Sequence, residues 1–155
     1  MAKTEFTTAP EIQEIAERIL ARPECAEHLM VNREMRITYL FMDGPETSSW
    51  AGRCYRTVGP FQRLTAYDFV IVAFKKSWDK ATEHAKEALV FHELMHVGWK
   101  MDKKGNVSYC LRDHFIETFP QEVLLYGTWN ESLEALKNAF NGDAQFPSSM
   151  GVNPE

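Results

Sequence analysis

The segment Ala88–Gly98 reads ALVFHELMHVG, and this stretch constrains both the fold and the chemistry of the chain more than any other. It is apolar nearly all round apart from two histidines and one glutamate, which is typical of a helix that ends inside a core. Charged residues dominate positions 79–87 just before it. With Asp79 as its N-cap, we expect one helix from Asp79 to Val97, ended by Gly98.

Within this segment, His92 and His96 are separated by one helical turn. Residues four apart on a helix lie on one face, so both imidazoles can reach a single Zn²⁺. Glu93 projects about 100° further round, which places it beside a metal-bound water and not among the ligands. Zinc lowers the pKa of such a water, and a carboxylate can take its proton as the oxygen attacks a carbonyl. The pattern therefore predicts a zinc-dependent hydrolase with Glu93 as the general base.

The surroundings of the two histidines matter, because a random chain of this composition carries the same pattern at a rate of roughly 0.016. At 100° per residue, the stripe within about 60° of His92 consists of Ala81, Ala85, Ala88, Leu89, His92 and His96. We therefore expect both histidines on the buried half of the helix. Two buried histidines without polar partners would be costly, which favours a metal site over two structural histidines.

One further protein ligand is expected, because zinc in hydrolases has three protein ligands and one open position. His114, 18 residues after His96, is the only other histidine downstream. Glu117 is an alternative ligand, or a hydrogen-bond acceptor that supports His114. Asp102 and Cys110 are further alternatives, so spacing alone leaves the third ligand open.

The rest of the chain predicts an α+β fold. We expect an N-terminal helix from Pro10 to about Arg22, in which apolar residues recur at helical spacing. Strands are expected near 36–42, 53–58, 67–74 and 107–111, forming one small mixed or antiparallel sheet that packs on the N-terminal helix and the zinc-binding helix. Further helices are expected at 115–125, with Pro120 bending or restarting it, and at 130–140. We expect a single domain over 1–140 and a flexible tail over 141–155.

The sequence resembles the putative phage metallopeptidase family, a minimal zincin domain. The matching stretches lie between about Arg36 and Gly127 and are Tyr67–Val72 (YDFVIV), Trp78, Ala88–His96 (ALVFHELMH), Arg112–Pro120 (RDHFIETFP) and Gly127. The resemblance implies His114 as the third zinc ligand and a phage- or prophage-encoded hydrolase. The sequence differs from the family at Phe115. In the family an Asp usually follows the third histidine, whereas here Phe115 follows His114 and Asp113 precedes it.

In a zincin-like architecture, the strand at 67–74 would lie near the site, where a substrate peptide could pair along its edge. We therefore predict a zinc metallopeptidase that acts on a peptide or protein, with zinc held by His92, His96 and His114 and the water activated by Glu93. One alternative is a non-catalytic, zinc-stabilised binding module, which Phe115 favours. A second is a SprT-like, DNA-associated protease.

The composition of the chain limits its expected partners and cellular location. The net charge of −5 argues against nucleic acid as the main partner, since phosphate binding normally requires a basic face. The chain has neither an apolar signal region near its N-terminus nor an apolar run long enough to span a membrane. Without an export signal, Cys25, Cys54 and Cys110 are expected to be reduced thiols. These features predict a cytoplasmic protein without a membrane partner, and they indicate no particular oligomeric state.

Overall fold

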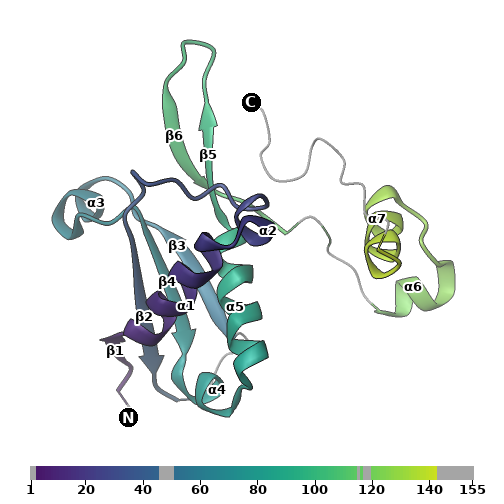
Figure 1. The fold of residues 1–155 in the computed structure, drawn as a ribbon, viewed down its shortest axis with the longest axis horizontal. Coiled ribbons are helices and arrows are strands. Elements are labelled where there is room, and N and C mark those ends of the chain that lie inside the picture. The colour runs from purple at the N-terminus through teal and green to yellow at the C-terminus, as the bar shows by residue number, and fades with distance from the viewer. Residues whose placement is uncertain (1–2, 46–50, 115, 117–119, 143–155) are drawn as a thin grey trace. The chain divides into compact units, whose positions relative to one another are not determined.

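The computed structural model describes residues 3–45, 51–114, 116 and 120–142. Its helices and strands form an α+β fold, as predicted (Figure 1). Contacts divide the chain into two compact units, Met1–Arg112 and Asp113–Glu155, which are described separately below. The single domain expected over 1–140 stays a prediction. Of the expected tail, residues 143–155 lie outside the described residues.

The first unit is built on a four-stranded sheet in the order β1-β2-β4-β3. These strands are β1 (Glu5–Thr8), β2 (Ile37–Asp43), β3 (Gly52–Arg56) and β4 (Phe69–Phe74). β2 and β4 pair in parallel and the other pairs are antiparallel, so the sheet is mixed. The strands predicted near 36–42, 53–58 and 67–74 are confirmed, and β1 is an additional one.

Because β4 lies between β2 and β3, both of its edges are paired. The prediction that a substrate could pair along the 67–74 strand is therefore wrong. A nearly continuous apolar run such as FVIVAF is typical of a strand inside a sheet, where neighbouring strands and helices cover it. The edge strand next to it is β3.

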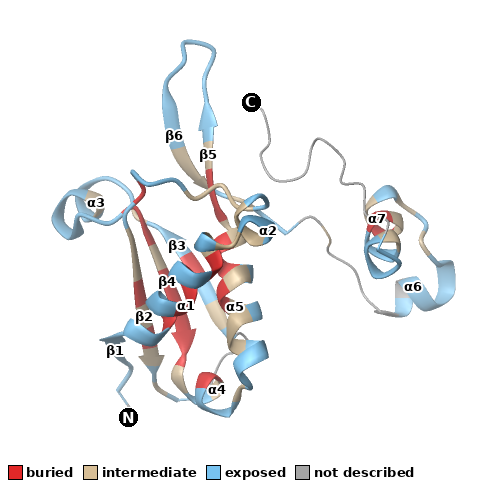
Figure 2. Ribbon diagram, viewed as in Figure 1, coloured by how far each residue is buried: buried red, intermediate tan, exposed pale blue. Residues whose placement is uncertain are grey.

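Two helices, α1 (Pro10–Ala21) and α5 (Glu83–Met95), lie side by side over one face of the sheet (Figure 1). Tyr39, Ile71 and Cys54 stand in register across β2, β4 and β3, and all three are buried. The two helices add the buried side chains Ile12, Ile15, Ala16, Ile19, Val90 and Leu94. This core, red in Figure 2, fixes the sheet against α5.

α5 begins later than predicted. A separate helix, α4 (Lys75–Lys80), precedes it, and the backbone is extended at Ala81. Thr82 is the N-cap of α5, and its hydroxyl oxygen accepts a hydrogen bond from the backbone N–H of Ala85 at 3.1 Å. The N-cap predicted at Asp79 is thus wrong. Trp78 explains the break, because its fully buried ring packs edge-on against Phe41 and anchors α4 independently.

A β-hairpin of β5 (Val97–Met101) and β6 (Val107–Leu111) follows α5 directly. The strand predicted at 107–111 is confirmed, but it pairs with β5 in a second, two-stranded sheet and is not part of the main sheet. β5 was not predicted, because Gly98 was expected only to end the helix. Gly98 instead lies inside the strand.

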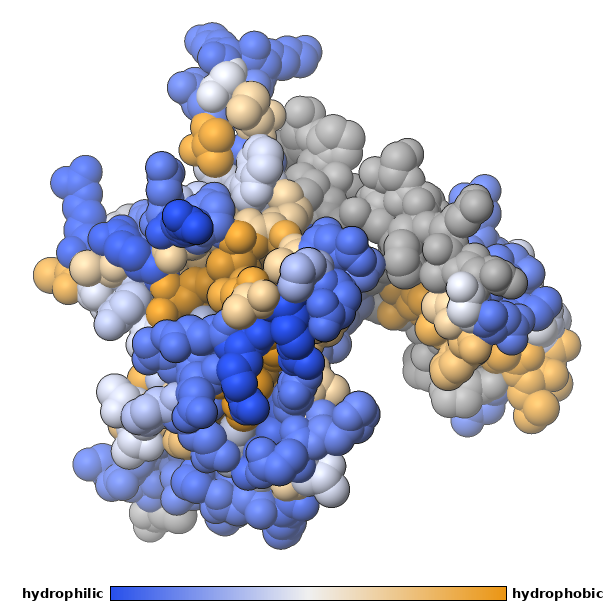
Figure 3. All heavy atoms as spheres, in the orientation of Figure 1, coloured by the Kyte–Doolittle hydropathy of each residue, from blue (hydrophilic) through white to orange (hydrophobic). Residues whose placement is uncertain are grey.

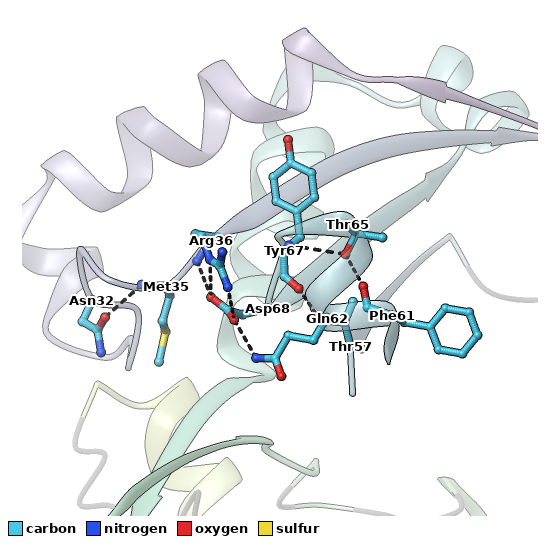
Figure 4. Close-up of polar contacts among 9 residues, drawn as sticks. All are labelled: Asn32, Met35, Arg36, Thr57, Phe61, Gln62, Thr65, Tyr67 and Asp68. Carbon is cyan, nitrogen blue, oxygen red and sulfur yellow. Dashed lines mark hydrogen bonds and ion pairs between the residues drawn. The ribbon is translucent and has the colours of Figure 1, made fainter. Parts of the chain in front are cut away.

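Two short helices complete the first unit, namely α2 (Pro23–Ala26) and α3 (Pro60–Thr65). α3 lies in the connection from β3 to β4 and packs beside the buried carboxylate of Asp68. That carboxylate accepts hydrogen bonds from the backbone N–H of Arg36 (2.9 Å), from the Arg36 guanidinium (3.2 and 3.3 Å) and from the Gln62 amide (2.8 Å) (Figure 4). Burial raises the pKa of Asp68, but these bonds outweigh it and hold the pKa below its usual range.

The second unit contains α6 (Pro120–Tyr126) and α7 (Glu131–Phe140). The helix predicted at 130–140 is confirmed, and Asn130 caps it by accepting a hydrogen bond from the N–H of Leu133. Of the helix predicted at 115–125, the structure shows α6 from Pro120 onward, while 115 and 117–119 lie outside the described residues. None of the described helices is long and apolar enough to cross a membrane.

Candidate metal centre

The three histidines predicted to bind zinc lie together. His92 is in the last turn of α5, His96 is its C-cap, and His114 follows β6 by three residues. One ring nitrogen of each can be chosen so that all three lie within 4.8 Å of one another. The rings of His92 and His96 are 5.2 Å apart between centroids, with planes inclined at 76°. The arrangement of these three side chains could hold one metal ion.

The β5–β6 hairpin closes the 18-residue gap between His96 and His114. Its register pairs Val97 with Leu111, so Arg112 lies opposite His96. The backbone N–H of Arg112 donates to the His96 carbonyl oxygen at 2.7 Å. The chain leaving β6 is therefore tied to the end of α5, two residues before His114.

A second bond between the same residues orients the His96 ring. Its Nδ1 lies 2.6 Å from the carbonyl oxygen of Arg112. A carbonyl oxygen only accepts hydrogen bonds, so Nδ1 of His96 is the donor in this contact. Metal-binding histidines commonly donate their second ring nitrogen to a backbone carbonyl in this way, which fixes the tautomer and the ring orientation. A donor set of three imidazoles with one of them oriented in this way fits a zinc ion.

One alternative third ligand, Asp102, has another role in the structure. The Asp102 carboxylate accepts hydrogen bonds from the backbone N–H groups of Lys104 (2.8 Å) and Asn106 (2.9 Å), and so closes the hairpin turn. Neither Asp102 nor Cys110 belongs to the metal-capable group found among the described residues. Glu117, like Phe115, lies outside the described residues.

The buried face of α5 differs from the predicted one. Ala85, Ala88 and His92 are exposed, whereas Val90, Glu93 and Leu94 are buried. The prediction that both histidines face the core is therefore wrong, since His92 is exposed and His96 is half-buried. A segment that is apolar nearly all round does not determine which side packs, and contacts with α1 and β3 decide it here.

Glu93 is only 4% exposed and points towards β3. Gly52 makes room for it, because a Cβ at Gly52 would lie 3.0 Å from Oε1 of Glu93 and 3.0 Å from Cδ1 of Leu89. Burial raises the pKa of the Glu93 carboxyl, and the charges of His96 and Arg53 offset part of that rise. Sequence reasoning missed Gly52, since an isolated glycine at a strand start carries no signal of its distant neighbour.

Comparison with protein families matches residues 4–141 to the family described as Putative phage metallopeptidase. The chain belongs to this family. The match extends on both sides of the 36–127 region on which the resemblance rested. No curated protein and no solved structure matches the chain. Membership of a metallopeptidase family implies a metal ion and a peptide substrate, and the histidine cluster is the candidate place for the ion.

Gly98 has a further role in this metallopeptidase-family chain. A Cβ at Gly98 would lie 2.7 Å from Cγ of Arg112 and 3.3 Å from Sγ of Cys110. Only a glycine therefore lets Arg112 approach this closely while its backbone holds His96. Together, Gly52 and Gly98 shape the space around the glutamate and one histidine of the motif.

Proposed function

We propose that the protein is a zinc-dependent peptidase in which His92, His96 and His114 bind Zn²⁺ and Glu93 is the general base. The observation that carries the proposal is the convergence of three histidine nitrogens within 4.8 Å, next in sequence to a buried glutamate. Zinc held there supplies Lewis-acid polarisation of a peptide carbonyl and a water of lowered pKa.

The residues of the chain divide the remaining work. Glu93 would take a proton from the water that attacks the peptide carbonyl and would then give this proton to the leaving amine. A carboxyl is best suited to both steps when its pKa lies nearer neutrality, and burial shifts the pKa of Glu93 in that direction. The carbonyl oxygen of Arg112 accepts a hydrogen bond from Nδ1 of His96, which fixes the orientation of the imidazole that would bind the ion.

The edge of β3 offers a place for the substrate backbone. Across the β3–β4 pair, the backbone N–H of Thr57 donates to the carbonyl oxygen of Asp68, and the N–H of Phe74 donates to the carbonyl oxygen of Ala51, both at 2.9 Å. Bonded and non-bonded positions alternate along an antiparallel pair, so the backbone groups of Gly52, Cys54 and Arg56 point away from β4. A substrate strand paired with this edge would pass beside Glu93, which lies against Gly52.

Metal analysis of the purified protein tests the ligand set. We expect about one zinc per chain, and His114→Ala should lose most of it because a third of the donor set is gone. His84→Ala is the matched control, since His84 is an exposed histidine at the start of α5 outside the cluster. Full zinc retention in His114→Ala would contradict the proposed ligands.

Cleavage of a proteome-derived peptide library, followed by mass spectrometry, tests catalysis. Glu93→Gln keeps the shape of the side chain but removes the proton acceptor, so zinc should remain while turnover falls by about 10²–10⁴-fold. Glu83→Gln, on the exposed start of the same helix, is the control and should cleave normally. Cleavage by neither wild type nor variant would favour a zinc-stabilised binding module, and equal cleavage by both would exclude Glu93 as the base.

A further inference from the structure

The edge of β3 leads from Glu93 to a pocket. This pocket has a volume of about 470 Å³ and lies between the β3–α3 connection and β6. The residues that line it include Arg56, Thr57, Gln62, Ser108 and Tyr109. Gly52 and Arg56 are four residues apart on β3, which corresponds to about 13 Å at the usual strand rise. One extended peptide along this edge would therefore reach both Glu93 and the pocket.

The pocket has a mixed lining with one positive charge. Hydroxyl and amide groups and the Arg56 guanidinium line it together with the apolar side chains of Val58 and Val107, and none of the described residues that line it is acidic. Arg56 donates from Nη1 to the carbonyl oxygen of Tyr109 at 2.6 Å, which holds the guanidinium against β6 and uses one of its five N–H donors. Two carboxylates outside the lining, Asp68 and Glu34, lie near enough to Tyr109 to act on it electrostatically. Asp68 accepts a hydrogen bond from Gln62 and is paired with Arg36.

Charge is distributed unevenly around this pocket. Segments 51–67 and 97–112, which contribute its walls, hold seven of the 17 Lys and Arg residues but only one of the 22 Asp and Glu residues. That one acid, Asp102, is engaged in its own turn. Hydrophilic side chains cover the hairpin tip (Figure 3), whereas α3 exposes the apolar side chains of Phe61 and Leu64. Two segments of an acidic chain thus have an excess of basic residues, of which Arg56 lines the pocket, and an excess of positive charge attracts and orients anionic ligands.

We propose that this pocket binds a carboxylate side chain of the substrate, so that the enzyme selects acidic peptides, and that Arg56 determines this selectivity. The proposal rests on the peptidase function proposed above. A substrate Asp or Glu three to five residues from the scissile bond, on one side of it only, receives hydrogen bonds from Arg56 and from the hydroxyl groups of the pocket. Charge-assisted bonds of this kind are stronger than neutral ones.

The first test uses the same proteome-derived library with the zinc-loaded wild type. We expect cleaved peptides to be enriched in Asp and Glu at one position three to five residues from the cut. A synthetic decapeptide with Glu at that position should be cleaved with a kcat/KM about tenfold higher than its Gln counterpart. The difference should shrink as salt is raised, because salt screens partly exposed charges.

Variants of Arg56 then test whether the pocket causes the preference for the Glu decapeptide. Arg56→Gln should abolish this preference, and Arg56→Lys should retain most of it. Arg56→Glu should instead prefer a decapeptide with Lys at the same position. Melting temperatures show whether loss of the bond to Tyr109 unfolds the hairpin instead. Arg63→Gln removes the same charge from α3 outside the pocket lining, so it should keep the preference.

Binding gives a second measurement that needs no turnover. A fluorescent Glu decapeptide should bind the Glu93→Gln protein more tightly than the Gln decapeptide, and Arg56→Gln should remove the difference. Cleavage without acidic enrichment, or enrichment that survives in Arg56→Gln, overturns this assignment and leaves the peptidase intact. Absence of any Glu93-dependent cleavage overturns both proposals. Tighter, Arg56-dependent binding of a single-stranded DNA oligonucleotide would make this surface a nucleic-acid site instead.

Discussion

Asp68 and Glu93 are both buried carboxylates in the first unit, with 3% and 4% of their surface exposed, yet their surroundings are opposite. Asp68 accepts hydrogen bonds from the backbone and guanidinium of Arg36 and from Gln62, and its pKa is lowered. No hydrogen bond to the Glu93 side chain occurs within the described part of the chain, and its pKa is raised.

This contrast distinguishes Asp68, a carboxylate that stabilises the fold, from Glu93, the carboxylate proposed to act in catalysis. Burying a carboxylate without a paired cation or donors is expensive, so Glu93 lowers the stability of the fold unless a bound cation compensates. In Asp68, the guanidinium of Arg36 provides that compensation. For Glu93, the nearby histidine cluster is where a cation would supply it.

Zinc is expected to have the largest effect on stability. A site that joins the end of α5 to the chain after β6 forms only in the folded protein, so zinc at 1,000 times its Kd should stabilise the fold by about 4 kcal/mol. Thermal melting with zinc and with a strong chelator measures this. His114→Ala should melt at the same temperature in both conditions. Identical midpoints for the wild type, with metal removal confirmed, would contradict the prediction.

The second largest effect on stability is expected for Asp68→Asn. This variant should lose about 2 kcal/mol in the free energy of unfolding, because the amide cannot form the charge-assisted bonds that the carboxylate makes with Arg36. Urea titration at pH 7 measures it. Since the pKa of Asp68 is lower in the folded protein, its contribution is present above about pH 4 and is lost as the pH falls through the folded pKa. The difference between wild type and variant should therefore narrow at acidic pH. A constant difference down to pH 2 would show that shape, and not charge, is responsible.

Gly52→Ala should cost about 1 kcal/mol, because the new Cβ would meet the Glu93 carboxylate and Leu89 at 3.0 Å. The same substitution should also reduce turnover by displacing Glu93. In the background of Glu93→Ala, which removes the carboxylate, the cost in stability should fall. A double-mutant cycle measures this coupling, and strict additivity would mean that Gly52 and Glu93 do not constrain one another.

The smallest effect is expected for Glu93→Gln in the metal-free protein, whose free energy of unfolding should stay within about 0.5 kcal/mol of wild type or rise slightly. The substitution removes a buried charge that no donor compensates. Measuring Glu93→Gln and Asp68→Asn under the same conditions tests directly whether the two buried carboxylates differ in their effect on stability. Equal destabilisation by the two amide substitutions would show that both carboxylates are structural.

Sequence reasoning predicted the elements of the site better than their orientation. The i, i+4 spacing of His92 and His96 depends only on helical geometry, so it could be read from the chain. The burial of Glu93 and the exposure of His92 could not, because the helix around them is apolar on nearly every side. Asp102 was a candidate ligand by type alone, and only the hairpin shows that its carboxylate closes a turn.

The sequence by itself determined the α+β character, three strands of the main sheet and the pair of histidines on α5, because each follows from periodicity within one segment. Only the tertiary structure decided what depends on residues far apart in the chain. Pairing of β5 with β6 brings His114 back to His96, the approach of Gly52 creates the space for Glu93, and β3 and not β4 has the open edge. Local patterns constrain which face of an element is apolar, whereas strand order and close backbone approach arise from packing between elements.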